Sequence, residues 1–181
     1  AVLRKQDNDE APRRKKDRQS AAHTQQSAYA KVANLWLQEN GASGKGAWTV
    51  VETSTIVRAI PPRWLPLYEK AAKSLHVIHA GVGLGVPKGK QLVPAASLAL
   101  STALNRSVFT QVEIGWEQAI HYLRKEAISL SPTTPQGIVL LTYRRQAIGF
   151  CKNIGNRANN LYPQEWKIKT THLPEQPINV L

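Results

Sequence analysis

The residues best suited to chemistry lie in one run near the carboxyl end, Lys152-Asn-Ile-Gly-Asn-Arg-Ala-Asn-Asn-Leu-Tyr-Pro163. Its cations can bind phosphate, its amides can hydrogen-bond to base edges or ribose hydroxyls, and the Tyr162 ring offers a face on which a base can stack. The same residue types also build long turns, since Gly and Asn readily adopt left-handed backbone conformations. We therefore expect this run to contact RNA, with a purely structural turn as the alternative.

The charge balance of the chain favours a polyanionic partner. Among 181 residues, 24 Lys and Arg stand against 12 Asp and Glu, so the formal net charge is +12. The residues from Lys70 to Val112 contain no acid, and Glu165 and Glu175 are the only acids after Ala127. Such a surface indicates nucleic acid first and an anionic membrane second. Catalytic schemes that need aspartate are disfavoured, because no Asp follows residue 17.

Three glycines, in Gly81-Val-Gly-Leu-Gly85, resemble the glycine loop of a dinucleotide or S-adenosylmethionine site. Such a loop needs a helix after it and an acid about twenty residues further on. Pro87 and Gly89 disrupt the required helix, and no acid occurs between Glu69 and Glu113. The glycines are therefore interpreted as permitting a tight backbone crossing between strands.

Other candidate sites fail on spacing or residue type. Lys88-Gly89-Lys90 lacks the earlier glycine and the following hydroxyl of a phosphate-binding P-loop. His76 and His79 would lie on opposite faces of a strand, so joint metal binding is not expected. Cys151, the single cysteine, is interpreted as a packing residue and not as a nucleophile. With no apolar membrane span and no signal core, we expect a soluble, cytoplasmic protein without its own metal or cofactor.

Hydrophobic periodicity and turn residues predict an alternation of helices and short strands. Residues 1–24 mix charges with Gln, Ser and Pro and are predicted to be a flexible basic linker. In segment 28–39, Val32, Leu35 and Trp36 fall on one face of a helix that Asn40-Gly41 ends. A second helix is predicted at 65–75, with Tyr68, Ala71, Ala72 and Leu75 facing inward. Two more helices are predicted at 95–104 and 116–127. The predicted strands are 48–51, 55–60, 76–86, 108–114, 137–143, 147–151 and 166–170.

Residues Gly149 to Ile168, preceded by Gly137 to Tyr143, resemble the C-terminal PUA-like RNA-binding domain of RsmF-type rRNA cytosine-C5 methyltransferases, which belong to the Sun family. His79 to Gly85 and Lys88 to Leu100 are similar to the start of that C-terminal region. Members of the family carry a methyltransferase domain before it, with a cofactor loop and two catalytic cysteines. This chain has neither and contains no Met, so it is expected to begin inside a longer product.

The spacing of the late strands predicts an α+β fold, with a small twisted β-barrel or sheet and helices packed outside. With the resemblance, this becomes a PUA-like β-barrel with packed helices at 89–181 that follows a small α/β linker module at 25–88. The resemblance implies that the chain holds small-subunit ribosomal RNA for its own N-terminal methyltransferase domain, which would bind S-adenosylmethionine, and that the chain alone carries no catalytic residue. The expected RNA-binding residues are Arg144, Arg145, Lys152, Arg157, Lys167 and Lys169 for phosphate, and Asn153, Asn160 and Tyr162 for ribose or base.

Two alternatives to RNA binding stay open. A structural module would mainly pack against its own catalytic domain and bind little RNA, with its positive charge serving solubility or an acidic neighbour. A self-sufficient enzyme is disfavoured, because the chain lacks a cofactor loop and has no aspartate beyond its amino-terminal arm.

Overall fold

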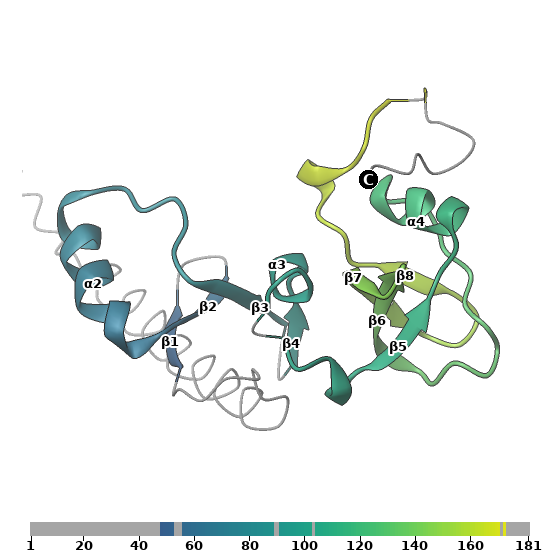
Figure 1. The fold of residues 1–181 in the computed structure, drawn as a ribbon, viewed down its shortest axis with the longest axis horizontal. Helices are drawn as coiled ribbons and strands as arrows, with labels where there is room; N and C mark the ends of the chain where they lie inside the picture. Colours follow the sequence, from purple (N-terminus) through teal and green to yellow (C-terminus); the bar gives the residue numbers. More distant parts are fainter. Residues whose placement is uncertain (1–47, 53–55, 89–90, 103, 171, 173–181) are drawn as a thin grey trace, which may run out of the picture.

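The computed structural model describes residues 48–52, 56–88, 91–102, 104–170 and 172. These residues form two four-stranded sheets with the orders β1-β2-β3-β4 and β5-β6-β7-β8, and a short helix lies between the sheets (Figure 1). The predicted α+β class is confirmed. No closed barrel is found among the described strands, so the predicted small barrel is not confirmed. The predicted linker at 1–24 and helix at 28–39 lie outside the described residues.

The first sheet is antiparallel throughout. Its strands are β1 Thr49–Glu52, β2 Val57–Ile60, β3 Val82–Lys88 and β4 Gln91–Pro94. The first two strands confirm the prediction to within two residues. Of the strand pair predicted at 76–86, the second part is confirmed by β3, whereas residues 76–80 form no strand. β4 was not predicted, because the four residues Gln-Leu-Val-Pro are too few to show a clear hydrophobic period. Pro94 is the last residue of this strand.

Close backbone approach explains two of the three glycines around β3, Gly81 and Gly85, whereas Gly83 faces the Ser97 and Ile56 side chains. A Cβ atom on Gly81, where φ is +62°, would lie 2.2 Å from the Ala59 carbonyl oxygen. At Gly85 it would lie 2.3 Å from the Val93 carbonyl oxygen. Side chains at these positions would separate β3 from its neighbours in the sheet. The interpretation of the glycines as a tight crossing between strands is confirmed for Gly81 and Gly85.

A helical segment follows β2 and packs loosely. The 3-10 turn η1 Pro62–Trp64 leads into helix α2 Leu65–Ser74, which confirms the predicted helix. No residue of α2 is buried, and Ala72 and Leu75 are exposed. The prediction that these two face inward is therefore wrong, because the described chain places no second layer against that part of the helix.

The two sheets share a hydrophobic core through helix α3 Ala96–Ala99. Leu98 of this helix packs in one cluster with Leu84 of β3 and Phe150 of β7. The predicted helix at 95–104 is thus reduced to one turn. Because β3 and β4 pair with each other, the change from one sheet to the next comes after Pro94 and not near residue 88. The division into modules stays a prediction.

The second sheet contains the predicted strands of the last third of the chain. Its strands are β5 Thr110–Glu113, β6 Gly137–Tyr143, β7 Gln146–Asn153 and β8 Ala158–Asn160, with β5 parallel to β6 and the other pairs antiparallel. The first three confirm the prediction, whereas β8 lies inside the expected loop 152–163. The predicted strand at 166–170 is wrong: the 3-10 turn η3 Gln164–Trp166 precedes a chain without regular structure.

Helix α4 Trp116–Leu123 covers the second sheet and is shorter than the predicted helix at 116–127. It ends where the backbone becomes left-handed at Lys125, with φ of +64°. Tyr122 of α4 is fully buried, and its hydroxyl donates to the Phe150 carbonyl oxygen at 3.0 Å. Cys151 is buried in the same cluster, and burial raises the pKa of its thiol to about 12. Its interpretation as a packing residue is confirmed.

Candidate nucleic-acid interface

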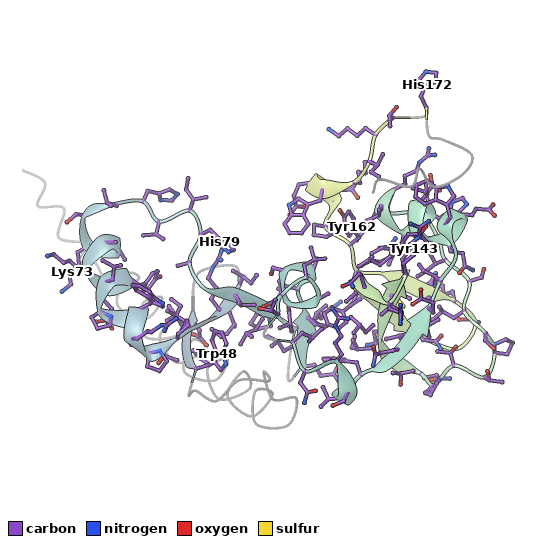
Figure 2. All side chains as sticks on the ribbon, in the orientation of Figure 1. Trp48, Lys73, His79, Tyr143, Tyr162 and His172 are labelled. Atoms are coloured by element: carbon purple, nitrogen blue, oxygen red, sulfur yellow. The ribbon has the colours of Figure 1, made fainter. Side chains whose placement is uncertain are left out.

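The nine residues expected to bind RNA do not gather at one place. Arg144 and Arg145 form the turn between β6 and β7, whereas Lys152 and Arg157 lie at the other end of β7 and just beyond it. The eight residues of β7 separate these two groups by about 20 Å, at roughly 3.3 Å per residue. The remaining cations, Lys167 and Lys169, follow η3. Figure 2 labels Tyr143, which precedes the arginine turn.

The turn between β6 and β7 displays two adjacent arginines in an unusual backbone conformation. Tyr143 pairs with Gln146, so the loop contains only Arg144 and Arg145. Their φ angles are 49° and 63°, the left-handed values of a type I′ hairpin turn that Asn and Gly usually occupy. A residue with a Cβ pays about 1 kcal/mol or more for this conformation. Two exposed arginines therefore occupy a backbone conformation that is unfavourable for residues with a Cβ atom.

Contacts from three directions hold this turn in place. The Arg145 amide donates to Glu113 Oε1 at 3.2 Å, and Arg106 Nη1 donates to the Arg145 carbonyl oxygen at 3.1 Å. The Arg144 guanidinium lies 5.6 Å from the centre of the Tyr143 ring. Arg106 itself belongs to the 3-10 turn η2 Arg106–Val108. We call Arg106, Arg144 and Arg145 the arginine tip.

Glu113 is a structural acid beneath the arginine tip. Its Oε2 accepts a hydrogen bond from the Thr142 hydroxyl at 2.5 Å, while Oε1 accepts the Arg145 amide. These contacts lower the pKa of the Glu113 carboxyl, with the Thr142 hydroxyl as the largest cause. Both oxygens of the Glu113 carboxylate are thus bound within the turn.

The lowered pKa predicts a pH dependence for the tip. The Glu113 contact contributes stability above the ordinary pKa of 4.5 and loses it as the pH falls through the lower folded value. We expect the Arg145 amide signal in NMR spectra to titrate with an apparent pKa below 4.5. The Glu113→Gln variant should abolish this titration. A midpoint at or above 4.5, or an unchanged titration in the variant, would contradict the assignment.

Asn153 is turned inward and serves the fold. Its side chain is 4% exposed. Its Nδ2 donates to the carbonyl oxygens of Thr134 and Pro135 at 2.9 and 3.1 Å, and its Oδ1 accepts the Gly155 amide at 3.0 Å. Both donors of its amide bind the chain's own backbone, so the structure gives Asn153 a structural role, and its contact with ribose or base stays a prediction.

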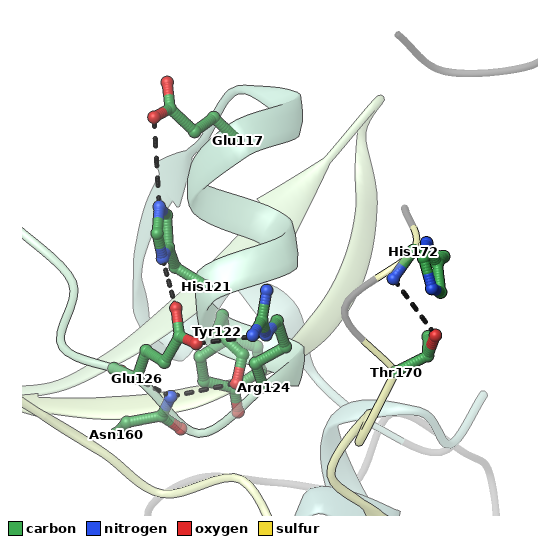
Figure 3. A network of polar contacts seen from close by, with 8 residues as sticks. All are labelled: Glu117, His121, Tyr122, Arg124, Glu126, Asn160, Thr170 and His172. Carbon is green, nitrogen blue, oxygen red and sulfur yellow. Dashed lines mark hydrogen bonds and ion pairs between the residues drawn. The ribbon is translucent and has the colours of Figure 1, made fainter. Parts of the chain in front are cut away.

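Asn160 has a similar structural role on the other side of the run. Its Nδ2 donates to the carbonyl oxygens of Tyr122 and Glu126 at 2.9 and 3.0 Å (Figure 3), and its Oδ1 accepts the Tyr162 amide at 2.9 Å. For these two asparagines, the alternative of a structural turn describes the structure better than the RNA-contact interpretation. The Asn153 amide connects the sheet to the segment before β6, and the Asn160 amide connects it to the end of α4.

Lys125 also stabilises this arrangement, and its role was not predicted from the sequence. Its Nζ donates to the Asn160 carbonyl oxygen at 2.9 Å and also to that of Tyr162. Desolvation lowers the pKa of the Lys125 ammonium, and nearby Glu165 opposes the shift. In the sequence it is one more cation at a helix end, and only the contact with a segment 35 residues later reveals its use.

The aromatic ring exposed for stacking is not the expected one. Tyr162 is half-buried, and its ring packs against the rings of Tyr122 and Trp166, with centroids 5.3 and 6.2 Å away. Trp166 is 47% exposed and stands immediately before Lys167, with Lys169 two residues further on. An exposed indole beside cations can stack on a base, so Trp166 replaces Tyr162 as the stacking candidate.

Two carboxylates, Glu117 and Glu126, lie beside His121 and Arg124 along α4 and just after it. His121 lies between them, with Nε2 3.8 Å from Glu117 Oε1 and Nδ1 in a close contact with Glu126 (Figure 3). Arg124 Nε lies 3.0 Å from the other Glu126 oxygen. This region attracts a polyanion less than the arginine tip does, because it carries two carboxylates, one of which pairs with Arg124.

The strand expected to place His76 and His79 on opposite faces is not formed at these residues. His76 and His79 lie in the irregular segment before β3 and are both exposed. His79 Nδ1 lies 3.0 Å from Arg58 Nη1. Across the described residues, no group of three or more His, Cys, Asp and Glu side chains could hold a metal ion. None of the helices in these ranges is long and apolar enough to cross a membrane.

Comparison with known proteins identifies the part of the chain that carries the tip. Residues 109–168 match the family described as "Methyltransferase RsmF PUA domain". A relative from Shewanella woodyi named "Ribosomal RNA small subunit methyltransferase F" is 38% identical over 82 residues, which are 45% of this chain. Those residues span 16% of the relative's length. The matched family range includes Arg144 and Arg145, whereas Arg106 stands just before it.

Proposed function

We propose that this chain, whose residues 109–168 match the RsmF PUA domain family, binds RNA through the arginine tip as part of a ribosomal RNA methyltransferase. The observation that carries the proposal is the strained turn that displays Arg144 and Arg145. Their backbone is anchored by Glu113 and Arg106. A turn that keeps two arginines at left-handed φ values, where Asn and Gly are favoured, points to a use for their side chains.

The chemistry of guanidinium groups supports phosphate as the ligand. Arginine presents a planar set of donors that matches two phosphate oxygens, and each contact releases counterions from the nucleic acid. Because the turn is anchored, little backbone freedom is lost on binding. Trp166 adds a stacking surface elsewhere on the domain, which favours RNA with unpaired bases.

The finer parts of the proposal rest on the relative's name. We infer that the RNA is ribosomal RNA of the small subunit, and that methyl transfer from S-adenosylmethionine belongs to a catalytic domain outside these 181 residues. Within that protein, this chain would hold the RNA at a defined distance from the catalytic domain. A location in the cytoplasm, where ribosomal RNA is modified, accords with this proposal.

Filter binding of the 181-residue chain to a small-subunit ribosomal RNA fragment tests the proposal. With three phosphate contacts, Kd should rise by about 20- to 40-fold between 50 and 200 mM salt, as counterion release requires. An RNA of equal length and unrelated sequence separates specific from general binding. An absence of binding at the lower salt concentration would leave the structural-module alternative, which the exposed apolar face of α2 favours.

A further inference from the structure

An apolar groove lies between helix α2 and the chain that returns to β3. It has a volume of about 360 Å³. Side chains from the end of β2, from α2 and from the segment before β3 line it, among them Ile60, Trp64, Leu67, Tyr68, Ala71 and Val77. Helix α2, which forms one wall of the groove, lies at the left end of the molecule, whereas β6 and β7, which carry the turn of the arginine tip, lie at the right (Figure 1). The groove is therefore separate from the proposed RNA site.

The walls of this groove are more exposed than a folded module usually allows. Trp64 is 51% exposed and Leu67 is 60% exposed, and α2 contains no buried residue. A contiguous exposed surface of large apolar side chains indicates that something covers it. Within the described ranges no segment does so, and the occupant must therefore come from another part of the chain or from a partner.

The sequence contains a segment of matching chemistry and length. As a helix, segment 28–39 would carry Val32, Leu35 and Trp36 on one face, with Ala30, Asn34 and Leu37 on the opposite side. As a helix its twelve residues would be about 18 Å long, against about 15 Å for the ten residues of α2. Its apolar face would lie along α2 and bury the exposed indole and leucine.

The connection to the first sheet keeps this segment beside the groove. Thr49 of β1 pairs with Ile60, a residue of the groove wall. Residues 40–47 connect segment 28–39 to Trp48, and eight residues span at most about 29 Å. Three of them are Gly41, Gly44 and Gly46, which allow the chain to reverse. A tether this short gives an effective concentration in the millimolar range, above that of any free partner.

We propose that segment 28–39 docks its apolar face into this groove and covers α2. The contact would complete a second hydrophobic layer on the first sheet. It would also fix the point at which residues 1–24 leave the folded module. The inference stands on the groove and the tether, and it does not depend on RNA binding.

A disulfide test in the full chain addresses the docking directly. Leu35→Cys with Leu67→Cys should form an intramolecular disulfide at least about tenfold faster than the control pair Leu35→Cys with Val108→Cys, because proximity sets the rate. Val108 is exposed and belongs to η2, away from the groove, and buried Cys151 stays in place. Disulfide-linked dimers without the intramolecular product would assign the groove to a second copy and overturn the proposal. Equal rates for the two pairs would also overturn it.

Hydrogen exchange of the α2 amides supplies a second readout. Leu35→Asp with Trp36→Asp should accelerate their exchange by about tenfold through loss of the covering layer. Ala30→Asp with Asn34→Asp introduces the same charge on the opposite helical face and should leave the exchange unchanged. The same α2 protection in both variants would overturn the docking. RNA affinity should be equal in the two variants, so failure here is distinguishable from failure of the proposed function.

Discussion

Reversing the charge of the turn, with Arg144→Glu and Arg145→Glu, should weaken binding to a small-subunit ribosomal RNA fragment by about 30- to 100-fold at 0.1 M salt. Both side chains are exposed, and their backbone is anchored to Glu113 and Arg106. Loss of two phosphate contacts should also lower the slope of log K against log salt by about 1.4 to 1.8. Filter binding over a salt series measures both effects.

The matched control lies at the other end of β7. Lys152→Glu with Arg157→Glu introduces the same change of charge at two exposed positions. Because these residues lie about 20 Å from the turn, we expect them to lower affinity only through the general field, by about threefold. Equal losses in the two double variants would show that RNA follows the overall charge and not the arginine tip.

A second turn variant separates charge from folding. Arg144→Asn with Arg145→Gly removes both guanidinium groups but supplies the residue pair that a type I′ turn prefers. The free energy of unfolding should therefore rise by about 1 kcal/mol while RNA affinity falls. A loss of affinity accompanied by a more stable fold cannot be attributed to unfolding. Unchanged affinity in this variant would contradict the proposed role of the tip.

Gly149→Ala should lower the free energy of unfolding by about 3 kcal/mol or more, since the site has no room for a methyl group. A Cβ atom there would lie 1.9 Å from the Tyr122 hydroxyl oxygen and 2.6 Å from its Cζ. Tyr122 cannot move aside, because it is fully buried and donates to the Phe150 carbonyl oxygen. In thermal unfolding, the expected fall in Tm is about 6 to 12 °C.

Gly115→Ala is the control for this substitution. No atom lies within 4 Å of a Cβ placed on Gly115, which precedes α4. Its effect should be about 1 kcal/mol or less, from the weaker helix cap alone. Combining Gly149→Ala with Tyr122→Phe removes the nearest clashing atom and should recover part of the lost stability. Equal effects of the two glycine substitutions in urea unfolding would show that Tyr122 can shift.

Local pattern was enough for the strands that are apolar and several residues long. Gly137–Tyr143 was predicted to the residue, because a continuous apolar run of this length with β-branched and aromatic residues is typical of a buried strand. It was not enough for β8 Ala158–Asn160, whose three residues carry two asparagines. Pairing with β7 places this strand, and that pairing depends on contacts outside the run.

The asparagine-rich run shows why residue chemistry alone misplaced part of the site. Amide side chains suit RNA and backbone carbonyls equally well. Asn153 and Asn160 find carbonyl partners 18 to 38 residues away along the chain, and no local pattern announces them. The same holds for Lys125, whose partners are the carbonyl oxygens of Asn160, at the end of β8, and of Tyr162, just after it.

By itself, the sequence determined the basic charge, the α+β class, the inert Cys151 and the resemblance of the last third to an RsmF-type PUA domain. These depend on composition, on short-range periodicity and on motif residues. Only the tertiary structure decided which cations lie close together. It joins Arg106 to the Arg145 carbonyl across 39 residues and places Glu113 beneath the same turn. Strand pairing sets these distances, and the order of residues along the chain does not contain them.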